Sequence, residues 1–246
     1  MSLHRPETLT SAAISYIRDA IVRGEFPPGY QLTEQTLSAQ LATSRGTVRE
    51  ALRALADTGL VQVFPHRGAF VSPLSARTAW EISSFRALLE PYAARLALET
   101  KRKDPAMIAA IREAYRQLQE AATQGDMFTI VNADMAFHAS ILSFCEHEVL
   151  REHLASVQVL TRRLIFHTKV YESDVEGEIE SHAPIVAAVE AGNATRLESL
   201  VRAHIIRAGK QLLETMAERE ADEGAGQLAR ALAANWPAVV DQGAEG

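Results

Sequence analysis

The sequence lacks several features that would mark other classes of protein. Its 246 residues include one cysteine, Cys145, which excludes an internal disulfide framework and fits a reducing compartment. No hydrophobic run approaches the roughly 20 residues of a membrane-spanning helix, and the N-terminal residues lack the apolar core of a signal peptide. We therefore expect a cytoplasmic protein with no membrane partner.

An excess of positive charge is also missing. The formal net charge is −6, whereas proteins that coat nucleic acid without sequence preference are usually strongly basic. The charge is uneven, because residues 1–75 carry a net +1 and the remainder a net −7. Hydrophobic residues make up 47% of the chain, enough for the cores of one large or two ordinary domains.

The N-terminal part of the sequence predicts a winged helix-turn-helix domain over residues 8–72. Apolar residues at helical spacing and stop signals predict helices over residues 11–23, 33–41 and 44–57. Thr33 and Ser44 are expected to cap the second and third helices. Two β-prone runs, 61–64 and 69–71, flank the turn 65–68 and predict the hairpin wing. Residues 73–76 are a predicted linker.

The third predicted helix has the composition of a DNA-recognition helix. Arginine can form two hydrogen bonds with guanine, threonine can contact a phosphate or a thymine methyl group, and glycine allows close approach of the backbone. Any single arginine could instead be a solvated surface charge, and Arg53, two turns into the helix, stays ambiguous. Four arginines on one helix and the wing favour DNA binding, and the candidate contacts are Ser44, Arg45, Gly46, Thr47, Arg49, His66, Arg67 and Gly68.

The rest of the chain predicts an all-α domain over residues 77–221, so the fold class is mainly α. Amphipathic patterns predict helices near 77–99, 104–125, 126–145, 147–167, 176–191 and 194–219. Residues 222–246 are rich in alanine and glycine, and we expect a poorly ordered or loosely docked tail with one possible short helix at 227–234.

Four side chains in the second domain suggest a metal site. Asp134 and His138 are four residues apart, so they project from one face of their predicted helix. His182 and His204 lie on the fifth and sixth predicted helices of this domain, 176–191 and 194–219, and antiparallel packing would bring them to a similar height. One carboxylate and three imidazoles suit zinc, nickel, manganese or iron. By spacing alone, satisfied core histidines are an equally good interpretation.

The first domain closely resembles the GntR family of bacterial transcription regulators over residues 11–72. The motifs that carry the resemblance are Arg18–Gly29, Leu32-Thr33-Glu34, Ser44–Leu52, Gly59-Leu60-Val61 and Arg67–Val71. The family commonly has proline or threonine after its serine-arginine pair, where this chain has Gly46. The base read at this position is therefore the least predictable one.

The second domain resembles the FadR-type branch, whose all-helical effector domain is called FCD. The matching segments are Phe85–Pro91, Asp134–His138, His182–Ile185 and Arg202–His204. In many members the equivalent aspartate and three histidines bind a divalent metal, so the resemblance implies a metal at Asp134, His138, His182 and His204. Arg86 could bind an effector carboxylate in a bidentate manner, or it could form a salt bridge with Glu90.

These patterns predict a homodimeric transcription regulator that is a repressor and not an enzyme. Its partners would be a double-stranded DNA operator with a short inverted repeat and a small organic-acid effector bound at the metal. The alternative is a metal-sensing repressor in which the divalent metal itself is the signal. A metallohydrolase with a DNA-binding appendage is disfavoured, because the chain has no catalytic base motif beyond Glu180 near His182.

Overall fold

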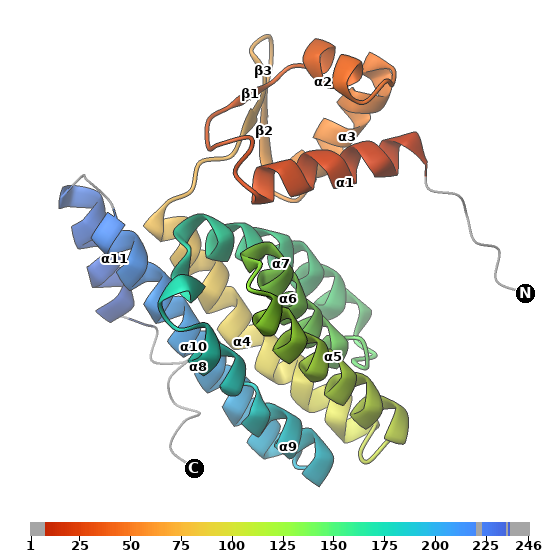
Figure 1. The fold of residues 1–246 in the computed structure, drawn as a ribbon, viewed down its shortest axis with the longest axis vertical. Coiled ribbons are helices and arrows are strands. Elements are labelled where there is room, and N and C mark those ends of the chain that lie inside the picture. Colours follow the sequence, from red (N-terminus) through yellow and green to blue (C-terminus); the bar gives the residue numbers. More distant parts are fainter. Residues whose placement is uncertain (1–7, 220–222, 235, 237–246) are drawn as a thin grey trace, which may run out of the picture. The chain divides into compact units, whose positions relative to one another are not determined.

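The computed structural model describes residues 8–219, 223–234 and 236 of the chain, drawn in Figure 1. The chain divides into two compact units, Met1–Leu74 and Ser75–Gly246. The boundary between the units falls within the predicted linker 73–76. None of the helices in the described residues is long and apolar enough to cross a membrane.

The first unit is a winged helix-turn-helix, as the sequence predicts. Its helices are α1 (Leu9–Val22), α2 (Glu34–Gln40) and α3 (Arg45–Asp57). The strands β1 (Gln31–Leu32), β2 (Val61–Phe64) and β3 (Gly68–Val71) form an antiparallel sheet of order β1-β3-β2. Apolar residues of α1, α3 and the sheet form its core, with Ile17, Val48 and Leu60 fully buried.

Local signals set the helix ends in this unit. Thr33 and Ser44 cap α2 and α3, because their hydroxyl oxygens accept hydrogen bonds from the backbone amides of Thr36 and Thr47 at 3.2 and 3.1 Å. Gly59 follows α3 at a φ of 78°, which suits glycine. Strand β1 was not predicted, since two residues are too few to show an alternating pattern.

The second unit is a helical bundle, as predicted. Its elements are α4 (Ala76–Thr100), α5 (Pro105–Gln124), α6 (Met127–Leu142), α7 (Glu148–Thr168), the 3-10 helix η1 (Val170–Ser173), α8 (Val175–Glu180), α9 (Ala183–Ala191), α10 (Ala194–Arg219) and α11 (Glu223–Ala234). Helix α10 packs along α4, α5 pairs with α6, and α7 packs against both α4 and α6 (Figure 1). The site described below lies inside this bundle.

The single helix predicted over residues 176–191 is wrong, because the chain forms two helices there. Helix α8 ends at Glu180 and α9 begins at Ala183. Pro184 lies in the first turn of α9, where its missing amide donor is tolerated, but a proline there disfavours continuous helix through the residues before it. The break places His182 at the N-cap of α9 rather than inside a helix.

A proline inside α4 is accommodated by a contact from another helix. Pro91 has no amide hydrogen, so the carbonyl of Ala87 one turn earlier lacks its helical donor. Arg202 of α10 donates a hydrogen bond from Nη1 to this carbonyl at 3.2 Å. The α4–α10 pairing thus satisfies a backbone group that the proline leaves open.

The described part of the tail is docked, which differs from the loosely attached segment expected. Helix α11 begins at Glu223, earlier than the predicted start at 227, and packs against α10 and α4. Trp236 is 6% exposed, and its ring lies against Gly209 of α10, where a Cβ would meet both the ring and Ser83 of α4. Residues 220–222, 235 and 237–246 are outside the described chain.

Candidate functional site

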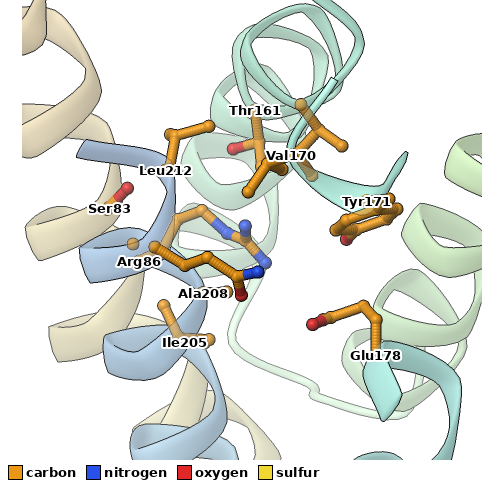
Figure 2. Close-up of a pocket in the computed structure, with 12 residues that line it drawn as sticks. Ser83, Arg86, Thr161, Val170, Tyr171, Glu178, Ile205, Ala208 and Leu212 are labelled. Atoms are coloured by element: carbon orange, nitrogen blue, oxygen red, sulfur yellow. The ribbon is translucent and has the colours of Figure 1, made fainter. Parts of the chain in front are cut away.

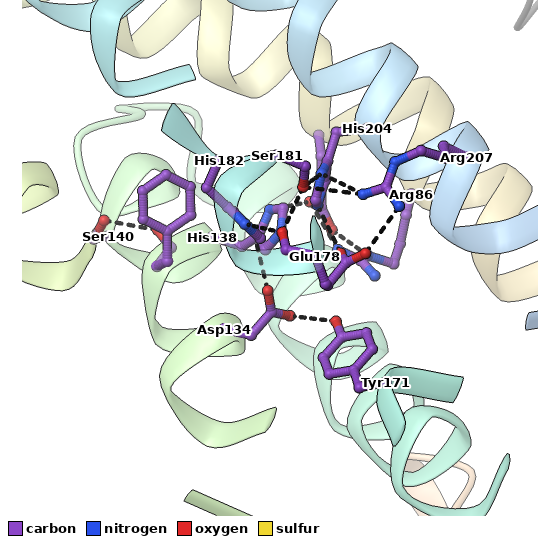
Figure 3. A network of polar contacts seen from close by, with 12 residues as sticks. Arg86, Asp134, His138, Ser140, Tyr171, Glu178, Ser181, His182, His204 and Arg207 are labelled. Atoms are coloured by element: carbon purple, nitrogen blue, oxygen red, sulfur yellow. Dashed lines mark hydrogen bonds and ion pairs between the residues drawn. The ribbon is translucent and has the colours of Figure 1, made fainter. Parts of the chain in front are cut away.

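Three histidines from different elements meet inside the bundle. His138 comes from α6, His182 from the break between α8 and α9, and His204 from α10. Each offers one ring nitrogen, and these three nitrogens all lie within 4.8 Å of one another. The side chains are buried, with His182 fully enclosed. The cluster, seen in Figure 3, therefore has the ligand type and spacing of a metal centre.

A second group of atoms orients each imidazole through Nδ1. His182 Nδ1 lies 3.0 Å from the backbone carbonyl of Glu178, and His138 Nδ1 lies 3.4 Å from the Glu90 carboxylate. His204 Nδ1 lies 3.1 Å from Ser181 Oγ, whose own hydrogen is donated to the Glu178 carbonyl. The Glu178 carbonyl and the Glu90 carboxylate favour a hydrogen on Nδ1 of His182 and His138, which leaves their Nε2 with the free lone pair that a metal requires. His204 Nδ1 also lies 3.5 Å from the Arg207 Nη2 donor, so its contacts do not fix one tautomer.

Asp134 lies beside the histidine cluster but outside the group of three that share the 4.8 Å spacing. Its Oδ2 accepts a hydrogen bond of 2.9 Å from the Tyr171 hydroxyl. Its Oδ1 lies 3.0 Å from His182 Nε2, yet both atoms are buried without a hydrogen-bond partner among the described residues. Unsatisfied buried polar atoms are rare in folded proteins, so a cation between these two would fit the residues present.

The charge states of Asp134 and His204 suit metal binding. Burial alone would raise the pKa of Asp134, but neighbouring His182 and His138, with the Tyr171 hydroxyl, lower it to about 2. Burial and the nearby charges of His182, His138 and Arg207 hold the pKa of His204 well below its usual value. Asp134 is thus a carboxylate and His204 a neutral imidazole, the forms that bind a metal.

Arg86 forms the salt bridge with Glu90 that the sequence suggested. Its Nε and Nη2 donate hydrogen bonds to Glu90 Oε1 and Oε2 at 2.5 and 3.2 Å, and both side chains are almost fully buried. Burial opposes charge on Glu90, but Arg86 and the hydrogen bond from His138 lower its pKa to about 2. In the described part of the chain no hydrogen bond engages Arg86 Nη1. One end of the guanidinium is therefore available to a ligand.

The pocket beside this site is small and lined by charged and polar groups. Arg86 and Glu178 face it from different helices, and Tyr171 lies nearby (Figure 2). Its cavity volume is about 20 Å³, room for about one water molecule. A small acid would therefore have to move the surrounding helices apart in order to bind.

Sequence reasoning missed several residues that complete this site. Tyr171 lies on the 3-10 helix η1, a short element without a sequence signal, and Ser181 lies at the unpredicted break. Glu90 was considered only as a partner of Arg86 and also contacts His138. Among the remaining histidines, His147 caps α7 by accepting a hydrogen bond from the Leu150 amide at 3.3 Å, which is a structural role.

The predicted DNA-reading residues of α3 form an exposed group at its N-terminus. Arg45 and Gly46 are exposed, and Ser44 Oγ lies 2.9 Å from Thr47 Oγ1. Arg49 is not free, because its Nε and Nη2 each donate a 2.7 Å hydrogen bond to Glu34 of α2. Its Nη1 and one hydrogen of Nη2 remain available, and this is the edge that can bind guanine in a bidentate manner.

The wing carries a second exposed group. His66 and Arg67 lie in the turn between β2 and β3, and Gly68 begins β3, with φ of 60° at His66 and 96° at Gly68. The Arg67 guanidinium lies over the Phe64 ring, 5.5 Å from its centroid. Gln31 of β1 donates a hydrogen bond of 3.1 Å to the Arg67 carbonyl. The wing tip is thus held in place, with its cationic side chain at the surface.

Two family descriptions match the chain, one for each unit. Residues 9–71 match "Bacterial regulatory proteins, gntR family", and residues 81–207 match the FCD domain. A probable D-xylose utilization operon transcriptional repressor from Paenarthrobacter nicotinovorans is 30% identical, over 80% of this chain and 86% of that protein.

Solved structures agree with these matches. E. coli McbR/YncC superposes with a TM-score of 0.73 at 25% identity, covering 84% of this chain and 98% of that one. A putative GntR transcriptional regulator from Rhodococcus sp. RHA1 superposes with a TM-score of 0.71 at 27% identity, covering 83% of this chain and 97% of that one. The family and these relatives are transcription regulators rather than enzymes. The chain therefore belongs to the GntR family of bacterial transcription regulators, with an FCD domain as its second unit.

Proposed function

We propose that this regulator is a repressor whose affinity for its operator is controlled by a small carboxylate bound at a divalent metal in the FCD unit. The observation that carries the proposal is the buried cluster of three imidazoles, whose ligand nitrogens all lie within 4.8 Å of one another. His138, His182, His204 and Asp134 would hold zinc, nickel, manganese or iron. The metal, when bound, supplies a site that accepts a carboxylate oxygen.

Arg86 favours an organic acid over the metal alone as the signal. A purely metal-sensing site needs no cation in the adjoining pocket, whereas Arg86 presents the free end of a buried guanidinium there. A guanidinium matches the geometry of a carboxylate. Entry of such a ligand into a cavity of about 20 Å³ would require the helices to shift, and a ligand that prefers the opened state moves the population toward it.

Helix α3 and the wing would bind the operator DNA. Arg45, Thr47 and Arg49 would contact bases and phosphates of the major groove, assisted by Ser44 and Gly46, while His66, Arg67 and Gly68 contact DNA from the wing. One recognition helix makes few contacts, so we infer a homodimer on a short inverted repeat. Repression is supported by the similarity to the probable transcriptional repressor from Paenarthrobacter nicotinovorans. The bacterial chromosome as partner implies a cytoplasmic location.

The metal is tested by elemental analysis of protein purified without chelators. About one divalent ion per chain is expected, and His204→Ala should lose it. His153→Ala is a matched control, because His153 is exposed and lies outside the cluster. Wild-type protein that contains no metal and does not take up zinc, nickel, manganese or iron would contradict the proposal.

The DNA-binding residues are tested on a duplex selected from a random pool by the full chain. Arg45→Ala should lower specific affinity while leaving the fold intact, since one bidentate base contact is worth about 1–3 kcal/mol. Arg95→Ala, an exposed arginine of the FCD unit, is the control.

The signal is tested by stripping and restoring the metal, with and without a panel of small carboxylates. This experiment distinguishes an organic acid from the metal itself as the signal. Release of DNA by the metal alone would favour the metal-sensing alternative.

A further inference from the structure

Glu178 is a buried acid that the four-residue metal set does not use. It lies on α8, its side chain is 6% exposed, and it lines the same pocket as Arg86. Its Oε2 accepts an ion-pair contact of 2.9 Å from Arg207 Nη1 of α10. Its Oε1 is buried and has no hydrogen-bond partner within the part of the chain that the structure describes. One carboxylate oxygen is therefore satisfied and the other is not.

The unsatisfied oxygen points toward the histidine cluster. Glu178 Oε1 lies 3.9 Å from His204 Nε2, too far for a hydrogen bond. Metal–nitrogen and metal–oxygen bonds are about 2.1 Å long, so two donors on one ion lie about 3 Å apart when adjacent and about 4.2 Å apart when opposite. The 3.9 Å separation falls within this range, as does the 3.0 Å between Asp134 Oδ1 and His182 Nε2. Glu178, like Asp134, lies outside the group whose ligand atoms all lie within 4.8 Å of one another among the described residues, so both carboxylates would move toward the ion on binding.

The backbone of the same residue also supports the cluster. The Glu178 carbonyl accepts hydrogen bonds from Ser181 Oγ and from His182 Nδ1. Arg207 holds the carboxylate from the solvent side, since its own side chain is 44% exposed. Figure 3 shows Glu178 between Arg207 and the histidines. The Arg207 ion pair on the solvent side and the hydrogen bonds to the Glu178 carbonyl on the other side therefore keep Oε1 facing the interior.

We propose that Glu178 is a fifth protein ligand of the metal, through Oε1. This inference rests on the metal site of the proposed function. With Asp134, Glu178 and three neutral imidazoles, a divalent ion would be electrically balanced inside the bundle. Five protein donors leave one position of an octahedral shell for the effector. The effector would therefore bind the ion through a single oxygen, and Arg86 would compensate the remaining negative charge of its carboxylate.

The test uses the full chain, stripped of metal and loaded with Co²⁺, whose visible absorption reports the number and type of its ligands. Glu178→Gln keeps the size of the side chain and removes the carboxylate. It should change the position and intensity of the Co²⁺ bands and lower affinity for Zn²⁺, measured by chelator competition, by at least about tenfold. Glu180→Gln on the same helix is exposed and should match the wild type.

Urea unfolding with and without Zn²⁺ separates metal ligation from a structural role. A ligand contributes only when the metal is bound, so Zn²⁺ should stabilise Glu178→Gln less than it stabilises the wild type, whatever the effect of the substitution on the metal-free protein. The proposal is overturned if Glu178→Gln keeps the wild-type spectrum and affinity, or if Zn²⁺ stabilises Glu178→Gln as much as the wild type. Wild-type protein that binds neither Co²⁺ nor Zn²⁺ would overturn the metal centre itself, and with it this ligand.

Discussion

Helix α4 carries three arginine–glutamate pairs at a four-residue spacing, and two of them lie in opposite environments. The Arg86–Glu90 pair has side-chain exposures of 8% and 2%, whereas those of the Arg95–Glu99 pair are 42% and 48%. Breaking a buried pair leaves an uncompensated charge in a medium of low dielectric constant, while water solvates the remaining charge of an exposed pair. The same substitution should therefore have very different effects at the two positions.

Glu90→Gln leaves Arg86 charged and buried without a counter-ion and weakens the acceptor of His138 Nδ1. Removal of one partner from a buried pair costs about 3–5 kcal/mol, and an exposed pair contributes about 0–1 kcal/mol. With a urea m-value of about 2.5 kcal/mol/M, the unfolding midpoint should fall by about 1.2–2 M. Glu99→Gln should lower it by less than about 0.4 M.

The chain is convenient for this assay because its two tryptophans, Trp80 and Trp236, both lie in the FCD unit. Their fluorescence during urea unfolding therefore reports that unit alone. The measurement is made in the presence of a chelator, so that a metal does not add to the stability. A midpoint for Glu90→Gln within 0.4 M of the Glu99→Gln value, by the same m-value, would refute the reasoning about the buried pair.

Three further predictions follow from contacts in the two units. Glu34→Ala frees Arg49, so the ratio of specific to non-specific DNA affinity should fall by about tenfold, within the 1–3 kcal/mol of a bidentate contact; an unchanged ratio in fluorescence anisotropy contradicts this. Thr33→Ala removes the α2 cap and should cost about 1 kcal/mol, seen as faster amide hydrogen exchange in α2 only. Gly209→Ala places a Cβ 2.6 Å from the Trp236 ring and 2.8 Å from Ser83 Cβ, and should cost about 1–3 kcal/mol by tryptophan fluorescence; wild-type stability would show that the ring does not pack there.

The elements that the sequence predicted well are those with local signals. Ser44 and Thr33 cap their helices as expected, because capping depends on residues within one turn. The hairpin wing and the long helices of the second unit follow from periodicity over many residues. The two-residue strand β1 and the break at His182 lack such a signal, and both were missed.

The residues of the candidate site also divide into those that a local sequence pattern predicted and those that only the tertiary structure brings together. Asp134 and His138 share a helix, so their spacing alone placed them on one face. His182 and His204 were suggested by antiparallel packing of two predicted helices and assigned through a family resemblance. The structure places both beside His138, and α9 and α10 pack together in the bundle. Tyr171 contacts Asp134 across 37 positions of sequence. No local pattern contains a contact of that range.

The amino-acid sequence by itself determined the two units, the capped recognition helix and the residue types available for a metal. Those features depend on propensity, periodicity and capping, which act over a few neighbouring residues. Only the tertiary structure decided that Arg49 is held by Glu34, that Arg86 is buried against Glu90, and that Glu178 faces His204. These pairings depend on side-chain direction and on burial, which follow from how whole helices pack.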